Sequence, residues 1–251
     1  FSFEASFSIR DYVPPSVDSS ALALDNSYID LVFDDELYGN YDETGMIETS
    51  DINIILISNG SNVDTCSITS LTRTDSNFLI GGETNVRVNL EYNNTPDGNE
   101  LIVLEPSEGT TLFDESGNQF SSTSYTDTLQ LNDILPPSID TISIPIDSFI
   151  VLMESTPITF SFNEKVDSLE FTVTAVMADS VNFDSTRSDS SLDIILNPPF
   201  TSFDSITVNF SYLEDEAGLS TVDIAYTYVT PILGDYDLDS AINYTDLWDL
   251  V

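Results

Sequence analysis

Acidic residues close to the C-terminal end of the sequence follow the spacing of a calcium-binding loop. Within a twelve-residue frame, the oxygen ligands would come from Asp235, Asp237, Asp239, Ala241, Asn243 and Asp246. In such an EF-hand loop the side chains at positions 1, 3 and 5 point at one ion, position 7 offers its backbone carbonyl, and position 12 closes the site. Carboxylate and carbonyl oxygens suit calcium, so we expect a calcium ion here.

Two features of this loop bear on its calcium affinity and on the type of loop it resembles. Ser240 stands at position 6, where glycine is usual, so we expect a strained turn and a weaker affinity without loss of the site. Asp246 at position 12, together with Asn243 at position 9, resembles the dockerin repeat. The resemblance implies calcium binding and, in dockerins with two such loops, docking to a cohesin-like domain. The sequence holds one loop, so cohesin docking stays open.

A second set of carboxylates recurs beside two proline pairs. Its members are Asp34, Asp35, Glu36, Asp114 and Glu115 in the first half and Glu164, Asp215 and Glu216 in the second, with Asp11 and Asp133 just ahead of the proline pairs. If the loops that hold them gather at one pole of a β-sandwich, calcium would stiffen the joint between neighbouring domains. The alternative is that they are ordinary solvated acidic loops.

The charge balance narrows the classes of partner. The sequence has 44 Asp and Glu residues against 5 Lys and Arg, which gives a formal net charge of −39. Such a charge repels phosphate backbones and anionic membrane surfaces, so nucleic acid is excluded as a partner. No apolar run reaches the roughly 18 residues of a membrane-spanning helix, so we expect no direct membrane insertion. Calcium is the expected small partner, and an extracellular or cell-surface location is the expected one.

The absence of histidine limits the kinds of catalytic and metal site that the protein can have. The sequence contains no His, which excludes a Ser-His-Asp triad, a Cys-His pair and a His-ligated zinc site. A carboxylate pair of the glycosidase kind is formally possible, but nothing in the sequence marks one pair among many. The single Cys66 rules out an intrachain disulfide and is expected to be a small buried hydrophobic residue. We therefore expect a protein that is not an enzyme.

Short runs of alternating apolar and polar residues predict an all-β chain. In the first half they span 28–33, 51–57, 84–92, 100–104 and 126–131, and in the second 157–162, 168–177, 192–196, 204–212 and 221–229. A period of two residues is typical of half-buried strands, and no stretch before residue 240 has a helical period. Hydrophobic residues make up 41% of the chain, enough for a packed core.

An internal repeat predicts two tandem domains. Residues 11–18, Asp-Tyr-Val-Pro-Pro-Ser-Val-Asp, match residues 133–140, Asp-Ile-Leu-Pro-Pro-Ser-Ile-Asp, at an offset of 122 residues. Two later motifs recur in the same order: Phe-Asp-Asp-Glu-Leu at 33–37 with Phe-Asn-Glu-Lys-Val at 162–166, and Asp-Glu-Ser-Gly-Asn at 114–118 with Asp-Glu-Ala-Gly-Leu at 215–219. Repeats of this length in an all-β chain indicate tandem domains, which we place at 12–133 and 134–231, with a partial dockerin-like loop at 232–251.

The first residues look like a final strand without its domain. At the same offset, residues 1–11 align with the last strand of the first repeat, and Phe1, Phe3, Ala5, Phe7 and Ile9 form one apolar face. Two explanations stay open. Either these residues end a preceding repeat, or they are an arm that adds as a strand to a neighbouring copy of the chain.

Several motifs resemble the bacterial Ig-like repeats of large secreted and cell-surface proteins. In residues 14–133 they are Leu-Val-Phe-Asp-Asp-Glu-Leu-Tyr-Gly-Asn from residue 31, Gly-Gly-Glu-Thr-Asn-Val-Arg-Val from 81, Pro-Asp-Gly-Asn-Glu from 96 and Phe-Asp-Glu-Ser-Gly-Asn from 113. The resemblance implies two tandem antiparallel Ig-like β-sandwiches acting as spacers, stalks, or adhesive and glycan-contacting modules.

These observations predict an extracellular, non-catalytic structural or adhesive protein whose Ig-like repeats are stiffened by calcium. Strand donation by residues 1–10 would let it polymerise with other copies of itself into a surface filament. The rival is a binding or anchoring region at the C-terminal end of a large secreted enzyme, in which the loop at 235–246 is half of a docking module.

Overall fold

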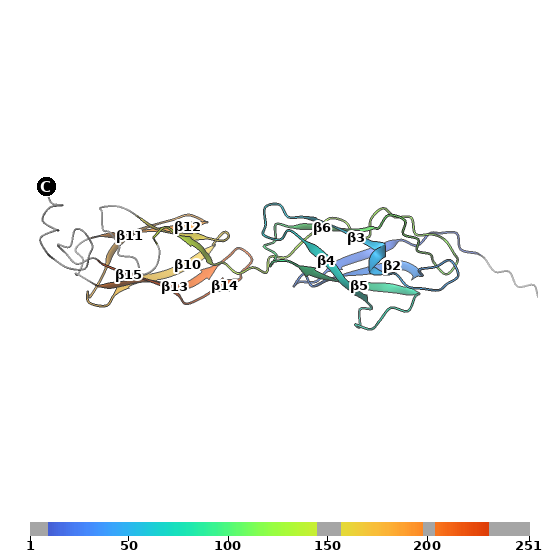
Figure 1. Ribbon diagram of the computed structural model, residues 1–251, viewed down its shortest axis with the longest axis horizontal. Coiled ribbons are helices and arrows are strands. Elements are labelled where there is room, and N and C mark those ends of the chain that lie inside the picture. Colours follow the sequence, from blue (N-terminus) through green and yellow to red (C-terminus); the bar gives the residue numbers. More distant parts are fainter. Residues whose placement is uncertain (1–9, 145–156, 198–203, 231–251) are drawn as a thin grey trace, which may run out of the picture. The chain divides into compact units, whose positions relative to one another are not determined.

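The chain folds into two compact units, Phe1–Leu135 and Pro136–Val251. The computed structural model of the protein describes residues 10–144, 157–197 and 204–230 of it (Figure 1). The units meet in the sequence at the second Pro-Pro pair, two residues beyond the boundary that the repeat predicts. The calcium loop at 235–246 and the apolar face of residues 1–9 lie outside the described residues.

The first unit is a sandwich of two antiparallel sheets. Its strands are β1 (Val17–Leu22), β2 (Tyr28–Leu37), β3 (Ile52–Ile57), β4 (Cys66–Thr72), β5 (Glu83–Tyr92), β6 (Leu101–Pro106) and β7 (Leu129–Gln130). One sheet has the order β1-β2-β5-β4 and the other β3-β6-β7. Seven strands in this order are those of an immunoglobulin constant-type domain. A short 3-10 helix at Thr49–Asp51 leads into β3.

The second unit repeats this order. Its strands are β8 (Ile139–Ile142), β9 (Ile158–Phe162), β10 (Ser168–Ala175), β11 (Asn182–Arg187), β12 (Ser191–Asn197), β13 (Ser205–Glu214), β14 (Ser220–Thr221) and β15 (Ile224–Val229). One sheet has the order β8-β9-β12-β11, and in the other β13 pairs with β10, β15 and the short β14. Each strand of the first unit therefore has a counterpart in the second, with β15 in the place of β7.

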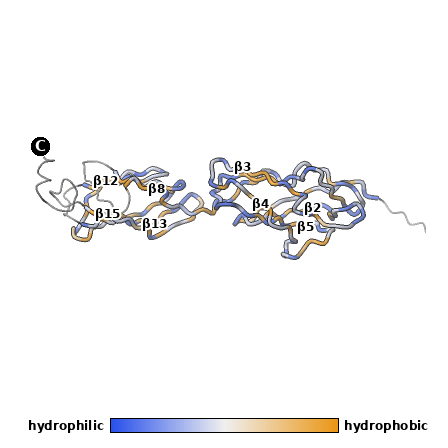
Figure 2. The backbone as a smooth tube through the Cα atoms, in the orientation of Figure 1, coloured by the Kyte–Doolittle hydropathy of each residue, from blue (hydrophilic) through white to orange (hydrophobic). Residues whose placement is uncertain are grey.

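Each unit has its own hydrophobic core between its two sheets, and the hydrophobic stretches in Figure 2 fall mainly on the strands. In the first unit Phe33 packs edge-on against Phe120 and Tyr125. In the second, Phe160 and Phe210 pack edge-on with ring centroids 5.0 Å apart. Side chains that alternate in and out along a strand bring one face of every sheet into the core, which is why the period of two predicted these strands.

The all-β prediction is confirmed, and its gaps follow a physical rule. The pattern missed β1, β4, β8 and β11, and these are the outer strands of the sheets β1-β2-β5-β4 and β8-β9-β12-β11. None of these four strands contains a fully buried residue, so their alternation is weak; five of the six residues of β11, for example, are exposed. The run predicted at 126–131 forms a strand at Leu129–Gln130 alone.

No helix among the described residues is long and apolar enough to cross a membrane.

Candidate metal centres at the poles of the sandwiches

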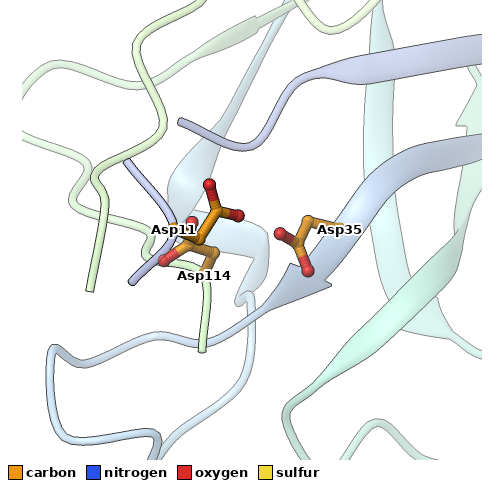
Figure 3. Close-up of side chains that lie close together, drawn as sticks. All are labelled: Asp11, Asp35 and Asp114. Atoms are coloured by element: carbon orange, nitrogen blue, oxygen red, sulfur yellow. The ribbon is translucent and has the colours of Figure 1, made fainter. Parts of the chain in front are cut away.

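Three aspartates from distant parts of the sequence meet at one pole of the first unit. Asp11 precedes β1, Asp35 lies near the end of β2, and Asp114 lies in the loop between β6 and β7 (Figure 3). Each offers a carboxylate oxygen, and the three oxygens lie within 4.8 Å of one another. Two oxygens that bind one calcium ion at 2.3–2.6 Å are at most about 5 Å apart, so the spacing of this triad suits calcium.

A tight turn fixes Asp114, the most buried member of the triad, at 1% exposed. Its backbone N–H donates to the carbonyl of Asn118 at 3.0 Å, and the N–H of Gly117 donates to the carbonyl of Asp114 at 3.1 Å. Gly117 has a φ of +79°, a conformation that glycine adopts at low cost. The side chain of Asp114 accepts from the backbone N–H of Asn118 at 2.7 Å and from its Nδ2 at 2.8 Å.

Hydrogen bonds attach the segment before β1 to this pole. Asn118 Nδ2 donates to the backbone carbonyls of Asp11 at 3.3 Å and Val13 at 3.2 Å. Asp34 accepts from the backbone N–H of Ser16 at 2.6 Å and from its hydroxyl at 2.7 Å. The bond from the Ser16 N–H is the largest of the interactions that lower the pKa of Asp34. Asp11 is thereby held beside the sandwich without using Asp34 as a metal ligand.

The second unit builds the same pole with the counterpart residues. Asn163, in the place of Asp34, accepts from the N–H of Ser138 at 2.6 Å, and its own N–H donates to the Ser138 carbonyl at 3.1 Å. The turn at Asp215 repeats that at Asp114, because the N–H of Asp215 donates to the carbonyl of Leu219 at 3.1 Å and Gly218 has a φ of +82°. Glu164 and Asp215 each offer a carboxylate oxygen, and the two lie within 4.8 Å of one another.

Only some of the acidic residues predicted from the sequence as calcium ligands lie close together in the structure. Asp11, Asp35 and Asp114 lie together in the first unit. Glu164 and Asp215 lie together in the second. Glu36 instead accepts a hydrogen bond from the Tyr38 hydroxyl at 2.7 Å, while Glu115 and Glu216 are exposed. Asp133, the counterpart of Asp11 in the repeat, lies two residues before the end of the first unit.

Two asparagines at the poles were not predicted from the sequence. Asn118 and Asn163 carry amides that hold the segment before each first strand, and neither was singled out. The repeat contained a signal for Asn163, because it stands where the first repeat has Asp34. Cys66 is half-buried and packs against the first core, where burial raises the pKa of its thiol to about 12. The Cys66 thiol is therefore protonated at neutral pH and is a poor nucleophile.

No protein-family model matches this sequence, and no curated protein matches it. Solved structures do match, among them the N-terminal part of the bacterial S-layer protein SbsC, at 15% identity and a TM-score of 0.30, covering 87% of this chain and 44% of that one. The S-layer protein rSbsC(31-844) matches at 15% identity and a TM-score of 0.29, covering 88% of this chain and 26% of that one. The chain thus spans less than half of either protein.

Proposed function

We propose that this protein is a non-catalytic, extracellular structural protein in which tandem Ig-like units are stiffened by bound calcium. The proposal rests on the observation that the two units share one strand order and one arrangement of polar residues at the pole. Both units have the same strand order, and both place a buried aspartate in the same glycine-containing turn. Repeated units of one kind suit a protein that sets length and spacing rather than one built around a single catalytic cleft.

Chemistry and charge support the same proposal. The sequence lacks the histidine that common hydrolytic sites use, and its net charge of −39 gives strong self-repulsion. Divalent cations bound between carboxylates reduce that repulsion where it is greatest. At the pole of the first unit, an ion held by Asp11, Asp35 and Asp114 would join the segment before β1 to both sheets of the sandwich.

Assembly into a polymer is the finer part of the proposal. Residues 1–10 carry alternate apolar side chains, and such a segment would be stabilised by adding to the edge of a sheet in another copy. Strands β1 and β4 are the outer strands of their sheet in the first unit, so they leave one side of their backbone without a strand partner in that sheet.

Removing the segment tests this assembly. We expect the chain without residues 1–10 to be monomeric under calcium concentrations at which the full chain forms filaments, as seen by negative-stain electron microscopy and sedimentation. A full chain in which Phe3 and Phe7 are both replaced by Ser provides the control that keeps the length. Filaments that persist in both variants would exclude strand donation.

The rival function rests on the loop at 235–246, whose spacing also fits half of a docking module. Size-exclusion chromatography of the full chain with a cohesin-like domain, with and without calcium, separates the two. A calcium-dependent complex would favour the anchoring role, whereas filaments formed by the chain alone favour the structural one.

A further inference from the structure

The equivalent turns at Asp114 and Asp215 differ at one atom. Asp114 has both carboxylate oxygens engaged, because Asn118 donates to one through its backbone and to the other through its side-chain amide. Asp215 accepts from the N–H of Leu219 at 2.9 Å through Oδ1, while its Oδ2 is buried and has no hydrogen-bond partner. The cause is the residue at the end of the turn, since leucine has no amide with which to replace that of Asn118.

An unpaired, buried carboxylate oxygen is costly. Asp215 is 3% exposed, so water does not compensate the missing hydrogen bond. A carboxylate oxygen of Glu164 lies within 4.8 Å of one of Asp215, and two carboxylates at this distance repel each other. A divalent cation bound by both carboxylates would remove both costs, because it would coordinate the unpaired oxygen and offset the charge of the pair.

From this difference we infer that the second unit holds a divalent-cation site built on Asp215 and Glu164, and that it binds calcium more tightly than the equivalent site of the first unit. In the first unit the Asn118 amide already donates to an oxygen that the ion would use, so the amide competes with the ion. In the second unit that oxygen is available. The ligands are carboxylate oxygens alone, which selects calcium over softer metals.

The inference deepens the proposed function and rests on it only for the purpose that the ion serves. The difference in affinity means that calcium binds the two poles in a fixed order. As calcium rises, the second unit becomes occupied first and the first unit follows, so stiffening along the chain proceeds in steps.

Hydrogen–deuterium exchange of the full chain in CaCl₂ and in a chelator locates the ion. We expect calcium to slow exchange at residues 163–167 and 215–219 at lower concentrations than at residues 34–38 and 114–118. Asp215→Asn should abolish the protection in the second unit, and isothermal titration should show one calcium fewer per chain. Glu216→Gln, which removes the adjacent exposed carboxylate, is the matched control and should titrate as the unaltered chain does.

Glu164→Gln guards against a folding defect, because Glu164 is only half-buried. It should lose the same calcium while the exchange of β12 and β13 in chelator stays unchanged. Calcium protection at 215–219 that survives in both Asp215→Asn and Glu164→Gln would overturn the site.

Leu219→Asn tests the order of affinity, because it restores the amide found in the first unit. The amide would pair with Asp215 Oδ2, and we expect calcium to bind the second unit about tenfold more weakly, the equivalent of one net hydrogen bond to a charged group. Unchanged or tighter binding would contradict the competition between amide and ion. Loss of the ion in Asp215→Asn without any change in filament stiffness would leave the site standing and overturn the structural role instead.

Discussion

At the scale of single residues, Asp204 shows how a buried carboxylate is retained in so acidic a protein. It is 1% exposed, and its Oδ1 accepts from the backbone N–H groups of Val176, Met177 and Ser205 at 2.8–3.1 Å. Its Oδ2 accepts from the N–H of Ala178 at 3.0 Å. Desolvation by itself would raise the pKa of Asp204, but the four backbone donors together lower it.

Asp204→Asn should therefore change how stability depends on pH. Because the pKa of Asp204 is lower in the folded state, its contribution is fully present above the unfolded value of about 3.9 and is lost as the pH falls through the folded value. The variant places an NH₂ against the Ala178 N–H, so we expect its Tm at neutral pH to fall by roughly 5 °C. Its Tm should also decline less steeply below pH 4.

Calorimetry between pH 2.5 and 7 measures both effects for Asp204→Asn. Asp179→Asn, which alters an exposed carboxylate of the neighbouring loop, is the control and should melt as the unaltered chain does at neutral pH. Parallel declines of the Asp204→Asn and unaltered chains in acid would show that Asp204 does not titrate in this range.

At the scale of elements, the two glycine turns give a matched pair of positions. Gly117 and Gly218 have φ values of +79° and +82°, so a side chain strains either backbone. They differ in their surroundings: a Cβ at Gly117 would meet Cε2 of Tyr41 at 2.6 Å, while a Cβ at Gly218 would meet nothing within 4 Å. The Tyr41 ring packs edge-on against Phe113 with centroids 5.7 Å apart.

Alanine at the two positions should separate backbone strain from side-chain crowding. We expect Gly218→Ala to destabilise the second unit by about 1 kcal/mol, from strain alone. Gly117→Ala should destabilise the first unit by about 1 kcal/mol more than that, because Tyr41 must leave Phe113. Urea unfolding followed by hydrogen exchange in each unit measures both, and equal costs would show that the Tyr41 contact contributes little.

At the scale of the whole molecule, the two cores are built from separate sets of residues. The first core draws on residues between Ile29 and Leu131, and the second on residues between Ile158 and Tyr228. A domain with its own core unfolds as its own cooperative unit. A cavity cut into one core should therefore leave the other stable.

Phe210→Ala tests this independence. Phe210 is 0% exposed and packs against Phe160 and Tyr226, so its loss should destabilise the second unit by about 3–5 kcal/mol. Hydrogen exchange in β2, β5 and β6 of the first unit should be unchanged. Val222→Ala, at a residue that is 55% exposed in the second unit, is the control. Faster exchange in the first unit of Phe210→Ala would contradict independent folding.

The sequence by itself determined the β class and the strands with strong alternation, and its repeat predicted a boundary two residues from the one between the two units. Those features follow from local periods and from a repeat, which are properties of neighbouring residues. Only the tertiary structure decided which carboxylates meet. Asp11 and Asp114 are 103 positions apart, and loop packing across a pole, which no local pattern encodes, brings them together while Asp34 and Glu36 turn to other partners. Strands β1, β4, β8 and β11 were likewise decided by pairing to neighbouring strands, because their own alternation is too weak to specify them.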